Sequence, residues 1–459
     1  MIMLDFFKKS PASAPFQGTP EQIDKRYKRM AFSSFIAATL GYSLYYVCRT
    51  TLNVVKQPII DDGILDATQL GVISSALLFA YAGGKFISGF LGDHSNIKRF
   101  MALGILVSTI ANLVVGFLGF FTAQQTAISL GAFYAVFAVF WGINGLGQSM
   151  GAPPCVIALS RWFPLSRRGT FYGFWSASHN LGEFFSFLLV SSLVAAFGWQ
   201  FGFIGAAIAG TIGFLIILFM LHDSPESKGL PPVEVYAHEK AEVKPEDKNI
   251  GKAQIIAIKN PYVWVLALAS AFMYVSRYAI NGWGVLFLQE TKGFELVQAA
   301  QIVSINALLG IIGTVFSGWV SDKFFKGNRY ILAVSAGLME VTALILFAFG
   351  GNQLWVNILA MVIFGIAIGV LICFVGGLMA VDIVPREASG AALGVVGLAS
   401  YAAAGLQDIV SGVLLDGNKV GDTYNFTPAL WFWIGAALLS VLLVCVVWHK
   451  AHQNKINKH

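Results

Sequence analysis

Charged residues are the scarcest feature of this 459-residue chain, since Asp, Glu, Lys and Arg together make up 12% of it. Average globular proteins carry roughly a quarter charged residues. Hydrophobic residues account for 56% of the chain, and the mean hydropathy is +0.70. This composition excludes a soluble domain, because an apolar surface of this size needs lipid to cover it. The sequence therefore predicts an integral protein of the lipid bilayer.

Cysteine is also scarce. Cys48, Cys155, Cys373 and Cys445 all lie within apolar runs and form neither a disulfide framework nor a metal-binding pattern. We expect buried thiols that pack as small hydrophobic groups, and no cofactor. A net charge of +6 requires no nucleic-acid partner. The chain also lacks a nucleophile–base or metal constellation, which argues against an enzyme.

Long apolar runs are what the chain has in abundance. About 20 consecutive apolar residues cross the hydrocarbon core of a membrane as a helix. The one long polar stretch, 222–259, divides the runs six and six. The predicted organisation is an amino-terminal segment 1–30, a six-helix bundle 31–221, the linker 222–259, a second six-helix bundle 260–448 and a tail 449–459. The predicted spans are 31–55, 69–91, 99–121, 128–159, 170–195, 198–221, 260–288, 296–320, 330–350, 353–382, 388–415 and 426–448.

We expect no cleavable signal peptide, because the first thirty residues are polar and mixed in charge, without a short apolar core. We expect the first membrane helix to act as an uncleaved insertion signal. Lys and Arg crowd the end of this segment and the loops after the second, fourth, eighth and tenth runs. Positively charged loops stay on the cytoplasmic side. The prediction is a multi-pass inner-membrane protein with both termini in the cytoplasm.

The two halves of the chain repeat each other. SGFLGD at 88–93 returns as SGWVSD at 317–322, and YYVCR ending at Arg49 returns as MYVSR ending at Arg277. The two offsets, 229 and 228 residues, are nearly equal, which is typical of an internal repeat. Transporters built from parallel repeats hold their substrate between the halves, near the middle of the bilayer.

Ionisable side chains interrupt several apolar runs. A charge inside a membrane span costs roughly 3 kcal/mol, so each such residue is a functional-site hypothesis. These residues are Arg49, Lys85, His179, Glu183 and Arg277.

Helical spacing places polar and aromatic residues beside these groups. One face on each of four spans carries a set: Tyr42, Tyr46 and Arg49; Tyr81 and Lys85; Trp175 and His179; Tyr274, Arg277 and Asn281. If the four faces point into one cavity, two guanidinium groups, an ammonium group and an imidazole meet there, which predicts an anion site. Arginine at both repeat positions favours phosphate, since a guanidinium grips two phosphate oxygens and stays ionised.

Each of these residues also has a structural interpretation that the sequence leaves open. Arg277 could belong to an interhelical ion pair, although its own span holds no carboxylate. Lys85 could extend to the headgroups or pair with an acid, and His179 could be a packed hydrogen-bond partner. We expect Glu183 to be a structural partner of one of the cations. Trp175 and the tyrosines, taken alone, are typical of helix packing.

Eight motifs occur in chain order: GYSLYYVCR (41–49), FAYAGGKF (79–86), APPC (152–155), RRGTFYGFWSASHNLG (167–182), DSPESKGLPP (223–232), YVSRYAINGW (274–283), SDKFFKGNR (321–329) and VPREASGAALGVVGLASY (384–401). With them the chain, from about residue 20 to 448, resembles the organophosphate:phosphate antiporters of the major facilitator superfamily. These are bacterial glycerol-3-phosphate, hexose-6-phosphate and phosphoglycerate transporters, with the related hexose-phosphate sensor. The resemblance implies the major facilitator fold, with twelve transmembrane helices in two six-helix bundles related by pseudo-twofold symmetry.

The resemblance also implies roles for individual residues. Arg49 and Arg277 would bind phosphate, and further residues would line the site: Lys85, His179, Tyr42, Tyr46, Tyr274 and Tyr401. Similar proteins exchange external organophosphate for internal inorganic phosphate by rocker-switch alternating access.

Three features depart from the family's pattern. Gly282 stands where relatives usually carry an acid, and Ala307 stands where they carry a Glu. The Gly-Pro that usually breaks the tenth span is missing from GVLICFVGGLMA. The phosphate-binding half of the pattern is intact, whereas much of the carboxyl partner set is altered, which leaves substrate identity and coupling open.

The prediction is a secondary antiporter that exchanges a sugar phosphate or glycerol-3-phosphate for inorganic phosphate, expected to act as a monomer. The alternative from another class is a membrane-embedded sugar-phosphate sensor that signals to a partner kinase.

Overall fold

The structure, a computed structural model, describes residues 6–123, 129–239, 255, 257–325, 328–384 and 388–456. Within these ranges, twelve helical segments are long and apolar enough to cross a membrane. This confirms the predicted all-α class and the number of spans. Residues 240–254 of the predicted linker, 385–387 of the last motif and 457–459 of the predicted tail lie outside the described residues.

The first six spans come from the amino-terminal half. They are α2 (Pro20–Asp61), α3 (Ala67–His94), α4 (Ile97–Ala123), α5 with α6 (Leu130–Ser149 and Ala152–Trp162), α7 with α8 (Leu165–Ser176 and Ser178–Phe197) and α9 (Trp199–Met220). Two short helices, η1 (Glu226–Lys228) and α10 (Val233–Tyr236), follow.

The last six spans come from the carboxyl-terminal half. They are α12 (Pro261–Lys292), α13 (Leu296–Phe325), α14 (Arg329–Phe349), α15 with η2 and α16 (Leu354–Cys373, Phe374–Leu378 and Met379–Asp382), α17 (Ser389–Asp416) and α18 (Thr427–Ile456). A short antiparallel hairpin, β1 (Lys419–Val420) and β2 (Thr423–Tyr424), separates the last two helices.

Helix boundaries coincide with capping signals in the sequence. Thr19 and Gln22 form a reciprocal capping box at the start of α2, and Asp66 and Gln69 do the same for α3. Helix α12 ends at Gly293, whose φ of 72° is the left-handed conformation that glycine adopts readily. Local sequence thus fixes the starts of α2 and α3 and the end of α12.

The tenth span is interrupted, but not in the way that a Gly-Pro pair would interrupt it. Helix α15 passes into a π-helical turn, Phe374–Leu378, before α16. Such turns are rare and occur often at functional sites. Gly376 and Gly377 lie within this turn, so the span keeps a local irregularity although the Gly-Pro is absent.

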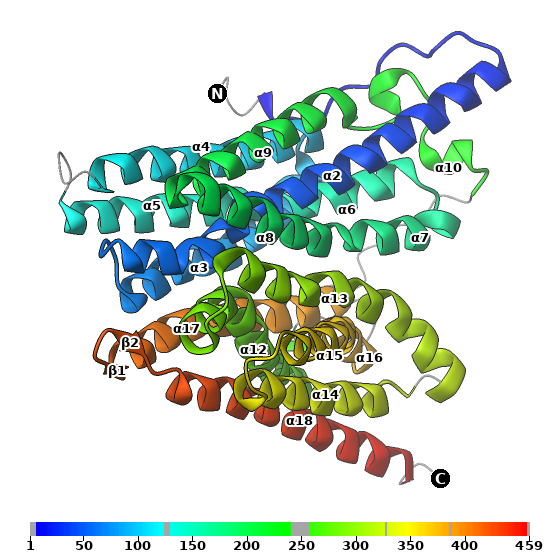
Figure 1. Ribbon diagram of the computed structural model, residues 1–459. Helices are drawn as coiled ribbons and strands as arrows, with labels where there is room; N and C mark the ends of the chain where they lie inside the picture. The colour runs from blue at the N-terminus through cyan, green and yellow to red at the C-terminus, as the bar shows by residue number, and fades with distance from the viewer. Residues whose placement is uncertain are drawn as a thin grey trace.

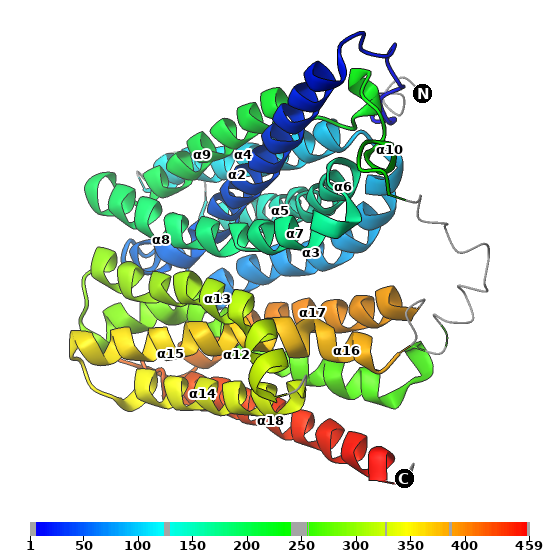
Figure 2. The same ribbon diagram turned by 90° about the vertical axis from the view of Figure 1, so that its right-hand side faces the viewer.

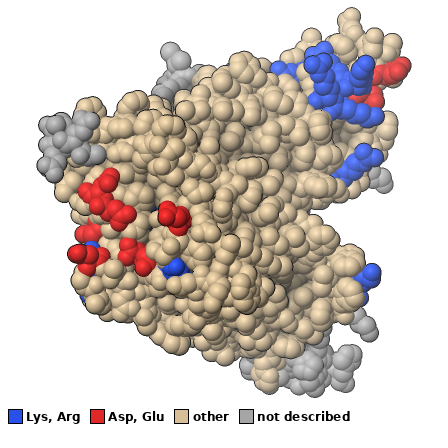
Figure 3. Space-filling model, viewed as in Figure 1, with Lys and Arg blue, Asp and Glu red and all other residues tan. Residues whose placement is uncertain are grey.

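The two halves pack as separate bundles that face each other. Figures 1 and 2 show α2–α9 in one bundle and α12–α18 in the other, and α3 meets α17, α8 meets α13 and α2 meets α12 across the interface. We call the end of the molecule beside residues 222–239 the linker end, and the opposite end the far end. The ribbons diverge toward the linker end in Figure 2, and the space-filling surface in Figure 3 is hollowed between the bundles there.

The far end is closed by direct contact between the bundles. A Cβ atom on Gly71 of α3 would lie 2.3 Å from the carbonyl oxygen of Asp408 on α17, so only glycine permits this approach. The backbone N–H of Thr68 donates to Asp416 Oδ2 over 2.5 Å. Basic side chains gather at the linker end and acidic side chains at the far end in Figure 3, the asymmetry that predicts a cytoplasmic linker end.

The first span is longer than the hydropathy pattern predicts. The predicted end at residue 55 is wrong, because α2 continues to Asp61 and includes Lys56, whose side chain is 1% exposed. Lys56 and Gln57 end the apolar run in the sequence, but the interface with the second bundle buries both.

The cysteine thiols were all expected to be buried. Cys48 and Cys155 are buried, whereas Cys373 and Cys445 are half-buried.

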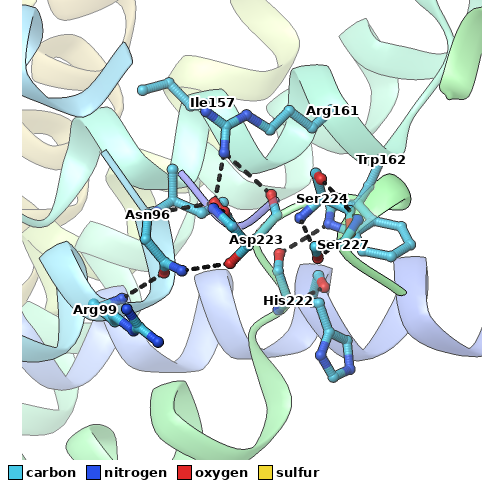
Figure 4. A network of polar contacts seen from close by, with 12 residues as sticks. Asn96, Arg99, Ile157, Arg161, Trp162, His222, Asp223, Ser224 and Ser227 are labelled. Carbon is cyan, nitrogen blue, oxygen red and sulfur yellow. Dashed lines mark hydrogen bonds and ion pairs between the residues drawn. The ribbon is translucent and has the colours of Figure 1, made fainter. Parts of the chain in front are cut away.

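Asp223 joins the start of the predicted linker to the first bundle (Figure 4). Its carboxylate pairs with Arg161 Nη1 of α6 over 2.6 Å, and it accepts the backbone N–H groups of Ile97 on α4 and Ser10 in the amino-terminal segment. Trp162 Nε1 donates to the carbonyl of His222 over 2.9 Å. The residues just after α9 therefore form a fixed cap on the linker end of the first bundle.

Candidate functional site

Two buried arginines, one from each bundle, line a single cavity between the bundles. Arg49 on α2 is 6% exposed and Arg277 on α12 is 7% exposed. The cavity has a volume of about 30 Å³. Arg49 Nη2 donates to the hydroxyl of Tyr278 on α12 over 3.0 Å, which links the two bundles. Arg49 Nη1 is buried and makes no hydrogen bond to any described residue, so one donor of this guanidinium is unused.

Aromatic rings surround both guanidinium groups. The Cζ atom of Arg49 lies 4.2 Å from the ring centroid of Tyr81, 5.3 Å from that of Tyr46 and 5.7 Å from that of Tyr401. A cation over an aromatic face is attracted by the negative face of the ring. The rings therefore compensate part of the cost of burying the positive charge and leave the Nη1 donor of Arg49 free for an anion.

Two tyrosine rings also lie close to the guanidinium group of Arg277. Its Cζ atom lies 5.5 Å from the ring centroid of Tyr274 and 5.6 Å from that of Tyr278. Tyr274 also contacts Tyr401 edge to face, with centroids 5.4 Å apart. Tyr274 and Tyr401 thus stand between the environments of the two arginines.

Lys85 lies on the open side of this cluster. Its Nζ atom is 5.3 Å from the ring centroid of Tyr401 and 5.9 Å from that of Tyr81, yet the residue is exposed. The bundles diverge toward the linker end, and Lys85 is the exposed member of this cluster. The charge is therefore close to the arginine pair without being sealed in with it.

His179 and Trp175 extend the cluster within the first bundle. The imidazole of His179 lies 5.7 Å from the ring of Tyr46, and Trp175 lies 5.3 Å from the ring of Tyr42. Tyr42 and Tyr46 contact each other at 5.5 Å. Trp175 Nε1 is buried without a hydrogen-bond partner among the described residues. These four side chains connect to the site through Tyr46, the one of them that lines the cavity.

Asn281 forms a second polar contact between the bundles. Its Nδ2 donates to Glu183 Oε1 of α8 over 2.8 Å, while its Oδ1 is buried and has no partner in the described part of the chain. Both residues line the cavity with the arginines. Glu183 is thus an interbundle hydrogen-bond acceptor beside two cations.

Four residues near the arginines were not among those predicted to bind substrate. Tyr278 follows Tyr274 by four residues, so helical spacing could have identified it. Asn53 follows Arg49 by four residues and lines the same cavity. Lys56 lies just beyond residue 55, where the first span was predicted to end, so it was not counted among the membrane charges. Nothing in the sequence pairs it with Asp408. Asp408 also lines the cavity. Within the described ranges, no group of three or more His, Cys, Asp or Glu side chains could hold a metal ion.

Twelve helices in two facing bundles, with buried cations from both bundles on one cavity, define a membrane transporter fold. The Major Facilitator Superfamily matches residues 38–407 of the chain. The chain belongs to this superfamily and, within it, to the organophosphate:phosphate antiporter family, as its full-length relatives show. This is a family of transporters and not of enzymes.

Three curated relatives illustrate the relationship. The chain is 33% identical to "Membrane sensor protein UhpC" of Salmonella typhimurium, over 87% of this chain and 89% of that protein. It is 31% identical to "Probable hexose phosphate transport protein" of Chlamydia pneumoniae, with 95% of each chain covered. It is 30% identical to the glycerol-3-phosphate transporter of Bacillus subtilis, over 97% of this chain and 98% of that one.

Solved structures support the fold at lower identity. A D-xylose–proton symporter superposes with a TM-score of 0.69 at 16% identity, covering 90% of this chain and 97% of that one. A bacterial homologue of the human lysosomal transporter Spinster superposes with a TM-score of 0.68 at 18% identity, covering 91% and 96%. These matches confirm the predicted major facilitator fold.

Proposed function

We propose that this protein exchanges a small phosphate monoester, a sugar phosphate or glycerol-3-phosphate, for inorganic phosphate across the bacterial inner membrane, with both termini in the cytoplasm. The observation that carries the proposal is the arginine pair, in which each bundle supplies one buried guanidinium to one cavity. A guanidinium matches two phosphate oxygens with parallel hydrogen bonds, and Arg49 has a buried donor unused.

The site also suggests how phosphate enters. A cavity of about 30 Å³ has room for a water molecule or two, which is less than a phosphate ion needs, so we expect a side chain to move when phosphate arrives. The hydroxyl of Tyr278, in the opposite bundle, accepts a hydrogen bond from Arg49 Nη2. A phosphate oxygen would replace the Tyr278 hydroxyl as the acceptor of this hydrogen bond. An anion held by arginines of both bundles favours the state in which the bundles approach each other over either open state.

The relatives support the substrate class. Two of them are named as transporters of hexose phosphate and glycerol-3-phosphate. A third is named as a membrane sensor, and this favours one alternative, a sugar-phosphate sensor that signals to a partner kinase. Both functions require the anion site, but only the antiporter moves its ligand across the membrane.

Counterflow in liposomes tests the proposal. The purified protein is reconstituted into vesicles loaded with unlabelled phosphate, and uptake of labelled glycerol-3-phosphate, glucose-6-phosphate and 3-phosphoglycerate is compared with uptake by vesicles loaded with sulfate. We expect phosphate-dependent uptake of glucose-6-phosphate or glycerol-3-phosphate. Binding of either ester without any uptake would contradict the antiporter and support the sensor.

Lys85 and His179 are expected to contribute unequally to substrate affinity. Lys85→Ala removes a full positive charge from the open side of the site, whereas His179→Ala removes a ring that reaches the arginines through Tyr46. We therefore expect the larger rise in the half-saturating organophosphate concentration for Lys85→Ala. Concentration-dependent uptake by the two variants checks this order, and an unchanged affinity in Lys85→Ala would assign that residue a structural role.

A further inference from the structure

A second pair of charges lies between the arginine site and the far end. Lys56 of α2 and Asp408 of α17 come from opposite bundles, with side chains 1% and 5% exposed, and their Nζ and Oδ1 atoms are 3.9 Å apart. Trp283 of α12 holds both partners. Its Nε1 donates to Asp408 Oδ1 over 2.9 Å, and its ring centroid lies 3.5 Å from Lys56 Nζ. Lys56 Nζ makes no hydrogen bond to any described residue, so the carboxylate and the ring compensate its charge.

Gly282 provides the room for this pair. A Cβ atom at position 282 would lie 3.2 Å from Asp408 Oδ1 and 3.6 Å from Lys56 Nζ. Any side chain would therefore project into the space that the two charged groups share. The carboxylate beside Trp283 comes from α17, and the preceding residue on α12 is a glycine that leaves the carboxylate unobstructed.

The position of the pair assigns it to one end of the molecule. Lys56 follows Arg49 by seven residues on α2, which is two helical turns, or about 10 Å, toward the far end. Beyond it, Gln57 Nε2 donates to Glu290 Oε1 over 2.5 Å, again between the bundles. The Lys56–Asp408 pair is thus the innermost contact of the far-end closure. It lies next to the cavity that the arginines line, on the side of the far end.

We infer that the Lys56–Asp408 pair, accommodated by Gly282, is the charged closure of the far end and must separate in each cycle for the cavity to open there. A buried charge is stable only while its partner remains in place. When the far end is closed, the two charges compensate each other. When it opens, water hydrates both. Removing one charge leaves the other buried and uncompensated, and opening the far end to water relieves this, so the variant favours the far-end-open state.

Distance measurements between spin labels test this inference. The labels are placed at two pairs of exposed positions, Ala196 with Asn352 at the far end and Thr170 with Phe324 at the linker end. Cys373 and Cys445 are replaced by serine, and the full-length protein is studied in lipid nanodiscs without phosphate. The distances are measured without phosphate, so their outcome does not depend on whether the protein transports phosphate. The experiment can therefore contradict this inference without contradicting the proposed exchange, and the reverse.

We expect Asp408→Asn to lengthen the far-end distance and shorten the linker-end distance, with at least a tenfold shift in the ratio of the two populations. The charge-exchanged double variant Lys56→Asp/Asp408→Lys should restore the original distances, as should the apolar double variant Lys56→Met/Asp408→Leu, which removes the uncompensated charge. The matched control is Asp382→Asn, because Asp382 pairs with Arg329 within the second bundle.

Two results would overturn the inference. One is an unchanged far-end distance in folded Asp408→Asn and Lys56→Met proteins. The other is a far end that opens equally in the single variants and in both double variants, which would assign the effect to altered packing and not to charge.

Discussion

Arg49→Lys and Arg277→Lys proteins are each expected to bind phosphate at least about tenfold more weakly than the native protein. Charge-assisted hydrogen bonds contribute roughly 1.5–3 kcal/mol each, and lysine keeps the charge but loses the two parallel donors of the guanidinium. Arg49 also donates to Tyr278 of the opposite bundle, so its replacement removes a link between the halves as well. The measurement is the phosphate concentration that gives half-maximal exchange in reconstituted vesicles.

The control for this experiment is Arg29→Lys. Arg29 lies on the same helix, α2, but is exposed at the linker end, so its replacement should leave exchange unchanged. Near-normal exchange by both Arg49→Lys and Arg277→Lys, in proteins shown to be folded, would contradict the proposal that the two arginines bind phosphate. The two arginines would then have only a structural role in the contacts between helices.

Gly182→Val is expected to destabilise the first bundle by about 2 kcal/mol or more, the cost of overpacking a tight contact. A Cβ atom on Gly182 would lie 2.1 Å from the carbonyl oxygen of Ser43, a backbone atom that cannot move without displacing α2. The hydroxyl of Ser43 donates to the carbonyl of Ser178 over 2.8 Å, so the same contact holds α8 against α2. Separation of these helices would also shift His179 and Glu183, which flank the glycine.

Thermal unfolding in detergent measures this effect, with Gly173→Val as the matched control. Gly173 lies on α7, the other half of the same span, and no atom would come within 4 Å of a Cβ atom placed there. The control variant should therefore melt close to the native protein. If Gly182→Val melts as the control does, the close approach of α2 and α8 is not what stabilises this part of the bundle.

Much of the fold could be predicted from the sequence because hydropathy and repetition are local properties. Runs of apolar residues predict the twelve spans, and the nearly equal offsets of the repeat place Arg49 and Arg277 at matching positions in two bundles. The structure brings both residues to one cavity. The end of the first span could not be predicted in this way, because Lys56 is polar in sequence but buried by a bundle that begins about two hundred residues later.

Contacts between the bundles escaped prediction for the same reason. Helical spacing groups residues on one helix, but it does not say that Lys56 meets Asp408 or that Asn281 meets Glu183. One departure from the family pattern now has a physical explanation, since Gly282 leaves space for the carboxylate of Asp408. Ala307 is buried within α13, and nothing in the structure explains its difference from the family pattern.

The central claim is that one site exchanges two phosphate-bearing ligands across the membrane. Its most direct test is efflux from vesicles that contain the protein and are loaded with labelled phosphate. Addition of external glucose-6-phosphate or glycerol-3-phosphate should start rapid release of the label, and external sulfate should not. Retention of the label after either ester is added, by a protein that binds the ester, would contradict exchange. Release that needs no external phosphate or phosphate ester would contradict it equally.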